Sequence, residues 1–173
     1  MYTMKTITVD AIPTALEKAR QYRLLNEPND AESICRDILA VQPDHQEALK
    51  TLLLALTDKF TPFGISPSFE QAREIVGQLD SSHCKAYFAG IIYERRAKYH
   101  LRQGGPGAGS AAHQWLMRAM ESFDLVIAEC DTKNQEAVLR WNSCARILNG
   151  NPEIHDDGGD SEQMFLDPFE TPH

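Results

Sequence analysis

The chain has 173 residues, 42% of them hydrophobic, and a formal net charge of −8 at pH 7. This length fits one domain that buries a core of its own. No apolar run approaches the ~18 residues that would cross a bilayer, and the first ten residues lack the apolar segment of a secretory signal. We therefore expect a cytoplasmic protein with no membrane contact.

The first predicted element is a pair of helices within residues 10–43. Its apolar and small residues recur at three- and four-residue spacing, which is typical of helices that bury one face. They are Ala19 and Tyr22 in the first helix, then Ala31, Cys35, Ile38 and Leu39 in the second, with Pro43 closing the pair. The same pattern of apolar and small residues returns 34 residues later, where Leu53 takes the place of Ala19.

A third pair follows, with an insertion between its helices. Gly90, flanked by Ala86 and Tyr93, takes the small position of the first helix, and Phe123 lies in the second. The sequence predicts that the first helix continues to Gln103, that the glycine-rich stretch 104–110 breaks it, and that a lengthened second helix begins at Ala111. The result would be a long, protruding hairpin.

The last predicted helix runs from about Asn134 to Leu148 and covers the third pair. Ala137, Trp141 and Cys144 recur on one face of it, and Gly150 and Pro152 stop it. Five residues lie where their side chains would cap the start of a helix: Asp80, Ser81, Ser82, Asp131 and Asn134. The predicted organisation is an N-terminal extension at 1–9, a helical domain at 10–149 and an acidic, disordered tail at 150–173.

The pattern Ala19-xx-Tyr22 with Ala31-xxx-Cys35-xxx-Leu39-xxx-Pro43 resembles the tetratricopeptide (TPR) repeat. The resemblance implies an all-α, right-handed α-solenoid of about three TPR-like hairpins, a C-terminal capping helix and an elongated hairpin in the third repeat. It also implies a scaffold or adaptor that binds a peptide or a partner protein in a concave groove lined by the first helix of each pair.

Carrying the family's groove positions onto this chain gives a surface with five cations and one acid. The resemblance thus implies an acidic, partly apolar partner. A solvated charged face is the alternative reading. The main groove residues are Arg20, Arg23, Lys50, Leu54, Tyr87, Ile91, Glu94, Arg95, Val138 and Asn142, and Arg146 is the fifth cation.

The tail contains seven acids between residues 151 and 173 and no Lys or Arg. Within it, Met164, Phe165, Leu166 and Phe169 resemble a short docking motif in composition. A tail that merely aids solubility is one alternative. Another is a self-assembling structural component, in which the tail or the protruding hairpin joins copies of the chain into a homo-oligomer.

The long hairpin carries basic and aromatic residues, including Arg96, Tyr99, Arg102 and Trp115. This composition suits a surface for a partner protein or for self-association, and the sequence pI near 5.2 argues against nucleic acid. The alternative is an ordinary elongated repeat in which Trp115 packs across to Tyr99.

No catalytic residues are predicted, because the sequence has neither a nucleophile elbow (G-x-S-x-G) nor a zinc-protease motif (H-E-x-x-H). We expect a protein that is not an enzyme, although an accessory domain of an enzyme complex stays open. The four cysteines are scattered without metal-ligand spacing, so neither a metal site nor a cofactor is expected.

Overall fold

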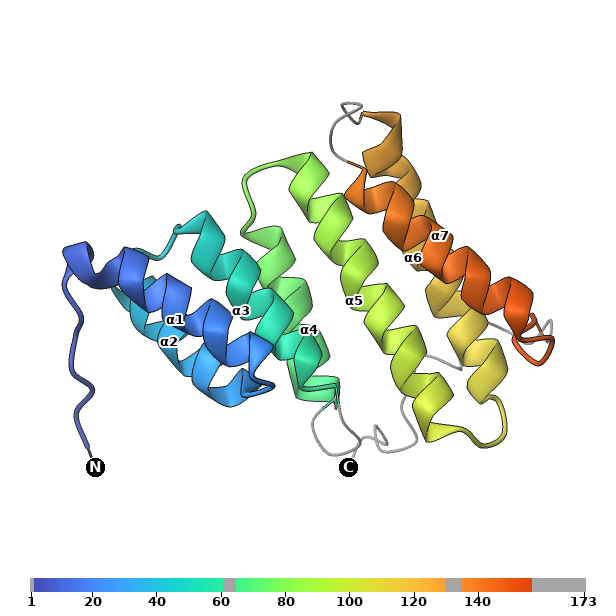
Figure 1. Cartoon of the computed structure of the whole chain (residues 1–173), viewed down its shortest axis with the longest axis horizontal. Coiled ribbons are helices and arrows are strands. Elements are labelled where there is room, and N and C mark those ends of the chain that lie inside the picture. The colour runs from blue at the N-terminus through green and yellow to red at the C-terminus, as the bar shows by residue number, and fades with distance from the viewer. Residues whose placement is uncertain (1, 61–64, 130–134, 157–173) are drawn as a thin grey trace, which may run out of the picture. The chain divides into compact units, whose positions relative to one another are not determined.

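The computed structural model of the chain is all-helical. It describes residues 2–60, 65–129 and 135–156, and in these ranges it contains seven α-helices, one short 3₁₀ helix and no strand. The chain divides into two compact units, Met1–Phe88 and Ala89–His173, and each has buried hydrophobic residues of its own. Figure 1 labels the helices in chain order.

The first unit begins with the 3₁₀ helix η1 (Val9–Ala11). It continues with α1 (Ile12–Leu24), α2 (Pro28–Val41), α3 (Gln46–Asp58) and α4 (Ile65–Gly77). Prolines stand in the first turns of α1 and α2, where a missing backbone N–H costs nothing. The helix α2 packs against both α1 and α3, α1 also reaches α3, and α3 packs against α4.

The core of the first unit joins α1, α2 and α3. Ile12 and Leu16 from α1 meet Ile38 from α2 and Ala48 from α3. Burying a side chain as large as Leu or Ile contributes about 1.5–3 kcal/mol, so this cluster holds the three helices together. Ala19 is completely buried, and so is Leu53 at the equivalent place 34 residues later.

Side-chain caps fix where two helices start. His45 Nδ1 accepts a hydrogen bond from the Ala48 backbone N–H at 3.2 Å and caps α3. Ser81 Oγ accepts from the Cys84 N–H at 3.1 Å, which confirms the predicted capping role of Ser81 at the start of the next helix. These bonds satisfy N–H groups that have no partner inside the helix.

The second unit holds most of α5 (Ser82–Gln103), then α6 (Ala108–Ala128) and α7 (Glu136–Gly150). The turn between α5 and α6 uses Gly104, Gly105 and Gly107 at φ of 66°, 90° and 78°, a region that glycine adopts without strain. The two long helices and the glycine break between them are thus confirmed (Figure 1), although α6 begins three residues earlier than expected because the turn is complete at Gly107.

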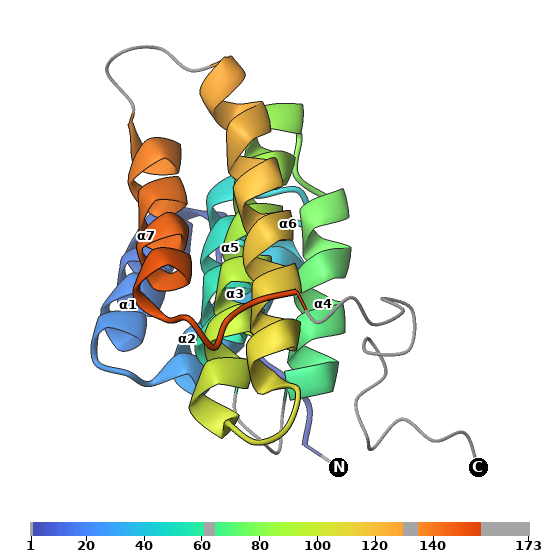
Figure 2. The ribbon, with the colours of Figure 1, turned by 90° about the vertical axis from the view of Figure 1, so that its right-hand side faces the viewer.

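The segment after α7 packs onto α6, and Figure 2 shows it crossing that helix. Ile154 is only 6% exposed, and its N–H donates to the Asn151 carbonyl at 3.0 Å. Gly109 makes this approach possible, because a Cβ atom there would overlap the Glu153 carbonyl oxygen. The second unit thus extends to Ile154, beyond the domain end at residue 149 that the sequence predicted.

Candidate functional site

The groove residues predicted for the first two repeats lie on neighbouring faces of α1 and α3. Arg20 Nη2 donates to Glu47 Oε2 at 2.6 Å, and Lys50 Nζ donates to Glu47 Oε1 at 2.9 Å. Arg23 Nε donates to Asp58 Oδ2 at 2.8 Å. The structure therefore brings the three predicted cations together, each against a carboxylate of α3.

The Glu47 carboxylate accepts hydrogen bonds from two cationic side chains, one on each oxygen. The hydrogen bond from Lys50 lowers the pKa of Glu47, with the nearby Arg20 acting in the same direction. The same hydrogen bond raises the pKa of Lys50. Arg20 and Glu47 stay about half exposed, at 52% and 49%, so their pair contributes only about 0.2–1 kcal/mol to stability and its groups remain accessible to a ligand.

The sequence reasoning missed Glu47 and Asp58. Both could have been found from helix spacing, because Glu47 lies three residues before Lys50 and Asp58 lies four residues after Leu54 on the same helix. These carboxylates offset the positive charge of Arg20, Arg23 and Lys50. With three cations against two carboxylates, the expectation of an acidic, partly apolar partner loses most of its electrostatic basis on α1 and α3.

Leu54 adds an apolar contact to this charged face. It is partly exposed on α3, four residues after Lys50 and four residues before Asp58. Residues spaced by four lie above one another on a helix. The α1–α3 face, defined here as Arg20, Arg23, Glu47, Lys50, Leu54 and Asp58, is therefore a mixed surface with an aliphatic centre.

Two further predicted groove residues lie in the interior, which corrects their assignment to a ligand surface. Ile91 is 1% exposed and Glu94 is 2% exposed. The Glu94 carboxylate accepts hydrogen bonds from Lys98 Nζ at 2.5 Å and from Arg140 Nη1 at 2.8 Å. Glu94 thus fastens α7 to α5 and is not available to a peptide.

The other predicted groove residues are partly buried. Tyr87 meets the ring of Phe88 edge to face, with ring centroids 5.4 Å apart. Arg95 lies on α5, while Val138 and Asn142 lie on α7.

Three of the four residues assigned to the surface of the long hairpin are buried, so that assignment is corrected. Arg96, Tyr99 and Trp115 are 5%, 8% and 6% exposed. The Arg96 guanidinium carbon lies 6.0 Å from the centroid of the Tyr99 ring and 5.8 Å from that of Trp115. Only Arg102 is exposed. The burial of Tyr99 and Trp115 agrees with the alternative of an ordinary elongated repeat.

The predicted docking motif at Met164, Phe165, Leu166 and Phe169 lies outside the described residues. Within the described ranges, no group of three or more His, Cys, Asp or Glu side chains could hold a metal ion. None of the helices in those ranges combines the length and the apolar composition needed to cross a membrane.

The buried cysteines are unreactive in character. Burial raises the pKa of Cys35 and that of Cys144 to about 12 each, which keeps both as neutral thiols at physiological pH. The thiolate is the form that attacks electrophiles or binds metals. Neither cysteine is thus poised for such chemistry.

Comparisons with known proteins yielded no match, whether with models of protein families, with curated proteins or with solved structures.

Proposed function

We propose that this chain is a TPR-like helical-repeat protein that binds another polypeptide on the α1–α3 face. The spacing of the helices supports the repeat: α3 begins 34 residues after α1, and the buried Ala19 and Leu53 are separated by the same interval. Stacked helical pairs of this length commonly serve as binding scaffolds.

The observation that carries the proposal is the network of ion pairs across α1 and α3. Glu47 joins Arg20 to Lys50, and Asp58 holds Arg23. The Arg23–Asp58 pair is mostly buried, at 20% and 17% exposed, so these two side chains are ordered before a ligand arrives, which reduces the entropy lost on binding. The network presents donors and acceptors in a fixed arrangement around Leu54.

This arrangement fits a partner of mixed charge with one apolar anchor. An aliphatic or aromatic side chain of the partner would cover Leu54, while its polar groups would exchange hydrogen bonds with Arg20 and Glu47. Apolar anchors at the centre of an interface supply most of the affinity, and charged groups around them set the orientation.

Site-specific photo-crosslinking in the source cells tests the proposal. A photoreactive amino acid replaces Leu54 in one variant and Glu74, an exposed residue of α4, in a matched control. The proposal predicts a recurring crosslinked polypeptide from position 54 that is missing from position 74. The same products from both positions, or none from position 54, would contradict it.

A further inference from the structure

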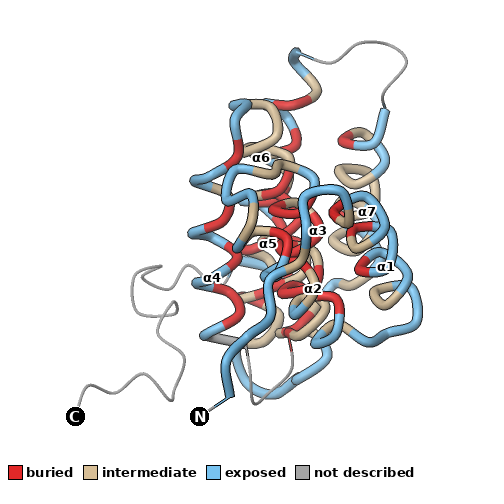
Figure 3. The backbone as a smooth tube through the Cα atoms, turned by 90° about the vertical axis from the view of Figure 1, so that its left-hand side faces the viewer, coloured by how far each residue is buried: buried red, intermediate tan, exposed pale blue. Residues whose placement is uncertain are grey.

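The segment that leads into α1 carries large apolar side chains without cover. Tyr2 is 98% exposed and Met4 is 86% exposed. Both lie in an extended arm, residues 2–8, which Figure 3 colours as exposed along most of its length. Scattered surface hydrophobics are ordinary, but two on one side of an extended strand can form a single contact strip.

The arm leaves α1 in a fixed direction. Ile7 packs against the core cluster of the first unit, and the Ala11 N–H donates to the Thr8 carbonyl at 3.1 Å within η1. Thr8 itself is extended, with φ of −83° and ψ of 155°. Tyr2 and Met4 therefore belong to a segment that is anchored to the first unit through Ile7, and Figure 1 shows its backbone leading away from α1.

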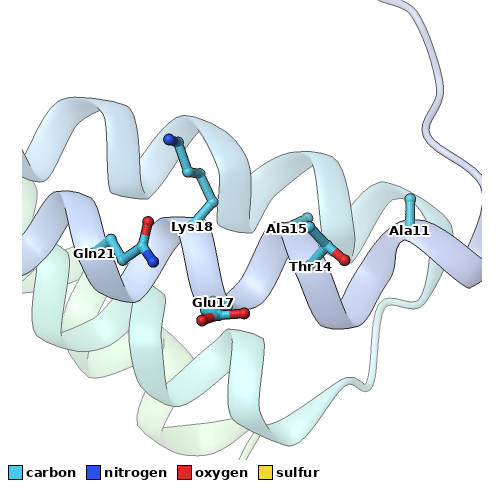
Figure 4. Close-up of a pocket in the computed structure, with 6 residues that line it drawn as sticks. All are labelled: Ala11, Thr14, Ala15, Glu17, Lys18 and Gln21. Atoms are coloured by element: carbon cyan, nitrogen blue, oxygen red, sulfur yellow. The ribbon is translucent and has the colours of Figure 1, made fainter.

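The side of α1 holds a shallow, open depression of about 390 Å³. Figure 4 shows Ala11, Ala15, Lys18 and Gln21 in a row along the helix. Small side chains at Ala11 and Ala15 leave room above the helix backbone, and Glu17 lies at the rim. From Ala11 to Gln21 the depression is about 15 Å long at 1.5 Å per helical residue.

The arm has the dimensions and chemistry to fill this depression. An extended stretch of six residues, from Tyr2 to Ile7, spans about 20 Å. Tyr2 and Met4 supply apolar contact, and Lys5 supplies a charge opposite to that of Glu17. Lys18 also lines the depression, but its ammonium group lies over the Tyr22 ring, 5.2 Å from the ring centroid. Neither Lys5 nor Glu17 forms an ion pair within the part of the chain that the structure describes.

The arm that fills the depression comes from another copy of the chain, because the chain's own arm leads away from its own depression. Figure 4 shows the arm departing at the Ala11 end, whereas the depression continues along α1 toward Gln21. Folding back would require a reversal at residues 9–11, which are held in the helical turn η1. A two-fold exchange lets each arm enter the depression of the other copy, so one contact is made twice.

The first helical pair also needs covering. Ala15, Ile34 and Val41 are partly exposed apolar residues packed against its core. Partly exposed apolar residues on a helical pair of this kind are ordinarily covered by a neighbouring unit. From these observations we infer that two copies of this chain form a homodimer, in which residues 2–8 of each copy lie in the α1 depression of the other. This dimer contact is separate from the α1–α3 face.

Solution mass tests the arm exchange. Light scattering and sedimentation of the full chain at about 100 μM should give a dimer that dissociates on dilution. Tyr2→Asp combined with Met4→Asp should weaken the dimer about tenfold or more. Leu24→Asp combined with Leu25→Asp is the matched control, because these leucines are 88% and 70% exposed at the end of α1, and it should leave the dimer intact.

A charge exchange tests which chains are in contact. In the proposed dimer, residue 5 of one copy meets residue 17 of the other. A homodimer of Lys5→Glu brings two acids together, and a homodimer of Glu17→Lys brings two lysines together, so each variant alone should dimerise more weakly. An equal mixture of the two variants should form a heterodimer of near wild-type strength, because both of its contacts then join opposite charges. A wild-type monomer, a dimer indifferent to the arm variant, or a mixture that does not recover would overturn the inference.

Discussion

Gly90 lies directly against the ring of Phe123. A Cβ atom at position 90 would come within 2.5 Å of Phe123 Cε1, closer than real side chains pack, and Phe123 is itself completely buried. The absence of a side chain at Gly90 thus lets α5 and α6 approach each other. The same position is occupied by Ala19 in the first helical pair of the sequence pattern.

Gly90→Ala should destabilise the protein by about 1–3 kcal/mol, because the added methyl group must displace a buried aromatic ring. Urea denaturation followed by circular dichroism measures the change. Gly77→Ala is the control, since nothing lies within 4 Å of a Cβ atom there. Equal stability losses in the two variants would show that packing against Phe123 is not the cause.

Removing the buried charge of Glu94 should destabilise the second unit. Glu94→Gln leaves Lys98 and Arg140 without their carboxylate; both cations are partly exposed, at 39% and 30%, so the loss is that of hydrogen bonds between charged groups, about 1.5–3 kcal/mol. The exposed pair of Glu70 and Arg73 gives the comparison, because its side chains are 59% and 55% exposed and Glu70→Gln should change stability by under about 1 kcal/mol. Similar melting temperatures for both variants would refute this difference.

The Glu32 carboxylate should make stability depend on acid pH. Burial alone would raise its pKa, but hydrogen bonds from Lys59 and Arg36 outweigh that effect and lower it from its ordinary value of 4.5. A lowered folded-state pKa means that the stabilisation is complete above the unfolded pKa and is lost as pH falls below about 4.5. Unfolding titrations from pH 7 to pH 3 should therefore show a smaller acid loss in Lys59→Met than in wild type.

An unchanged pH profile in Lys59→Met would assign the acid sensitivity to other carboxylates. Arg73→Met serves as the control, since its exposed partner Glu70 has little stabilisation to lose.

Cys35 and Cys144 should resist alkylation in the folded protein. Burial raises the pKa of each thiol to about 12 and also blocks access, whereas Cys84 is partly exposed. A short iodoacetamide pulse at pH 7.5, read peptide by peptide by mass spectrometry, should modify Cys84 before Cys35 and Cys144. Labelling of Cys35 at the rate of Cys84 without denaturant would contradict the buried positions.

The sequence predicted the helices well because periodic apolar residues and glycine breaks act locally. The turn at Gly104–Gly107 and the end of α5 at Gln103 follow from residues within one stretch of chain. The burial of Arg96 against the Trp115 ring could not be predicted in this way. It depends on α5 and α6 meeting through particular faces, where a guanidinium covers an aromatic ring.

The same limit applies to the binding surface. The pairing of Lys50 with Glu47 follows from their spacing on one helix, but the pairing of Arg20 with Glu47 exists only because α1 and α3 lie side by side. An ion pair between residues 27 positions apart in sequence is a tertiary property. It changed the expected ligand from an acidic peptide to one of mixed charge.

The most direct test of the proposed function is the affinity of the crosslinked partner segment for the purified full chain, measured by calorimetric titration. Leu54→Asp should weaken binding about tenfold or more, since it places a charge at the apolar centre of the α1–α3 face. Leu125→Asp, at a 66% exposed leucine of α6, should bind like wild type. Wild-type affinity in Leu54→Asp would contradict the proposal that this face is the binding site.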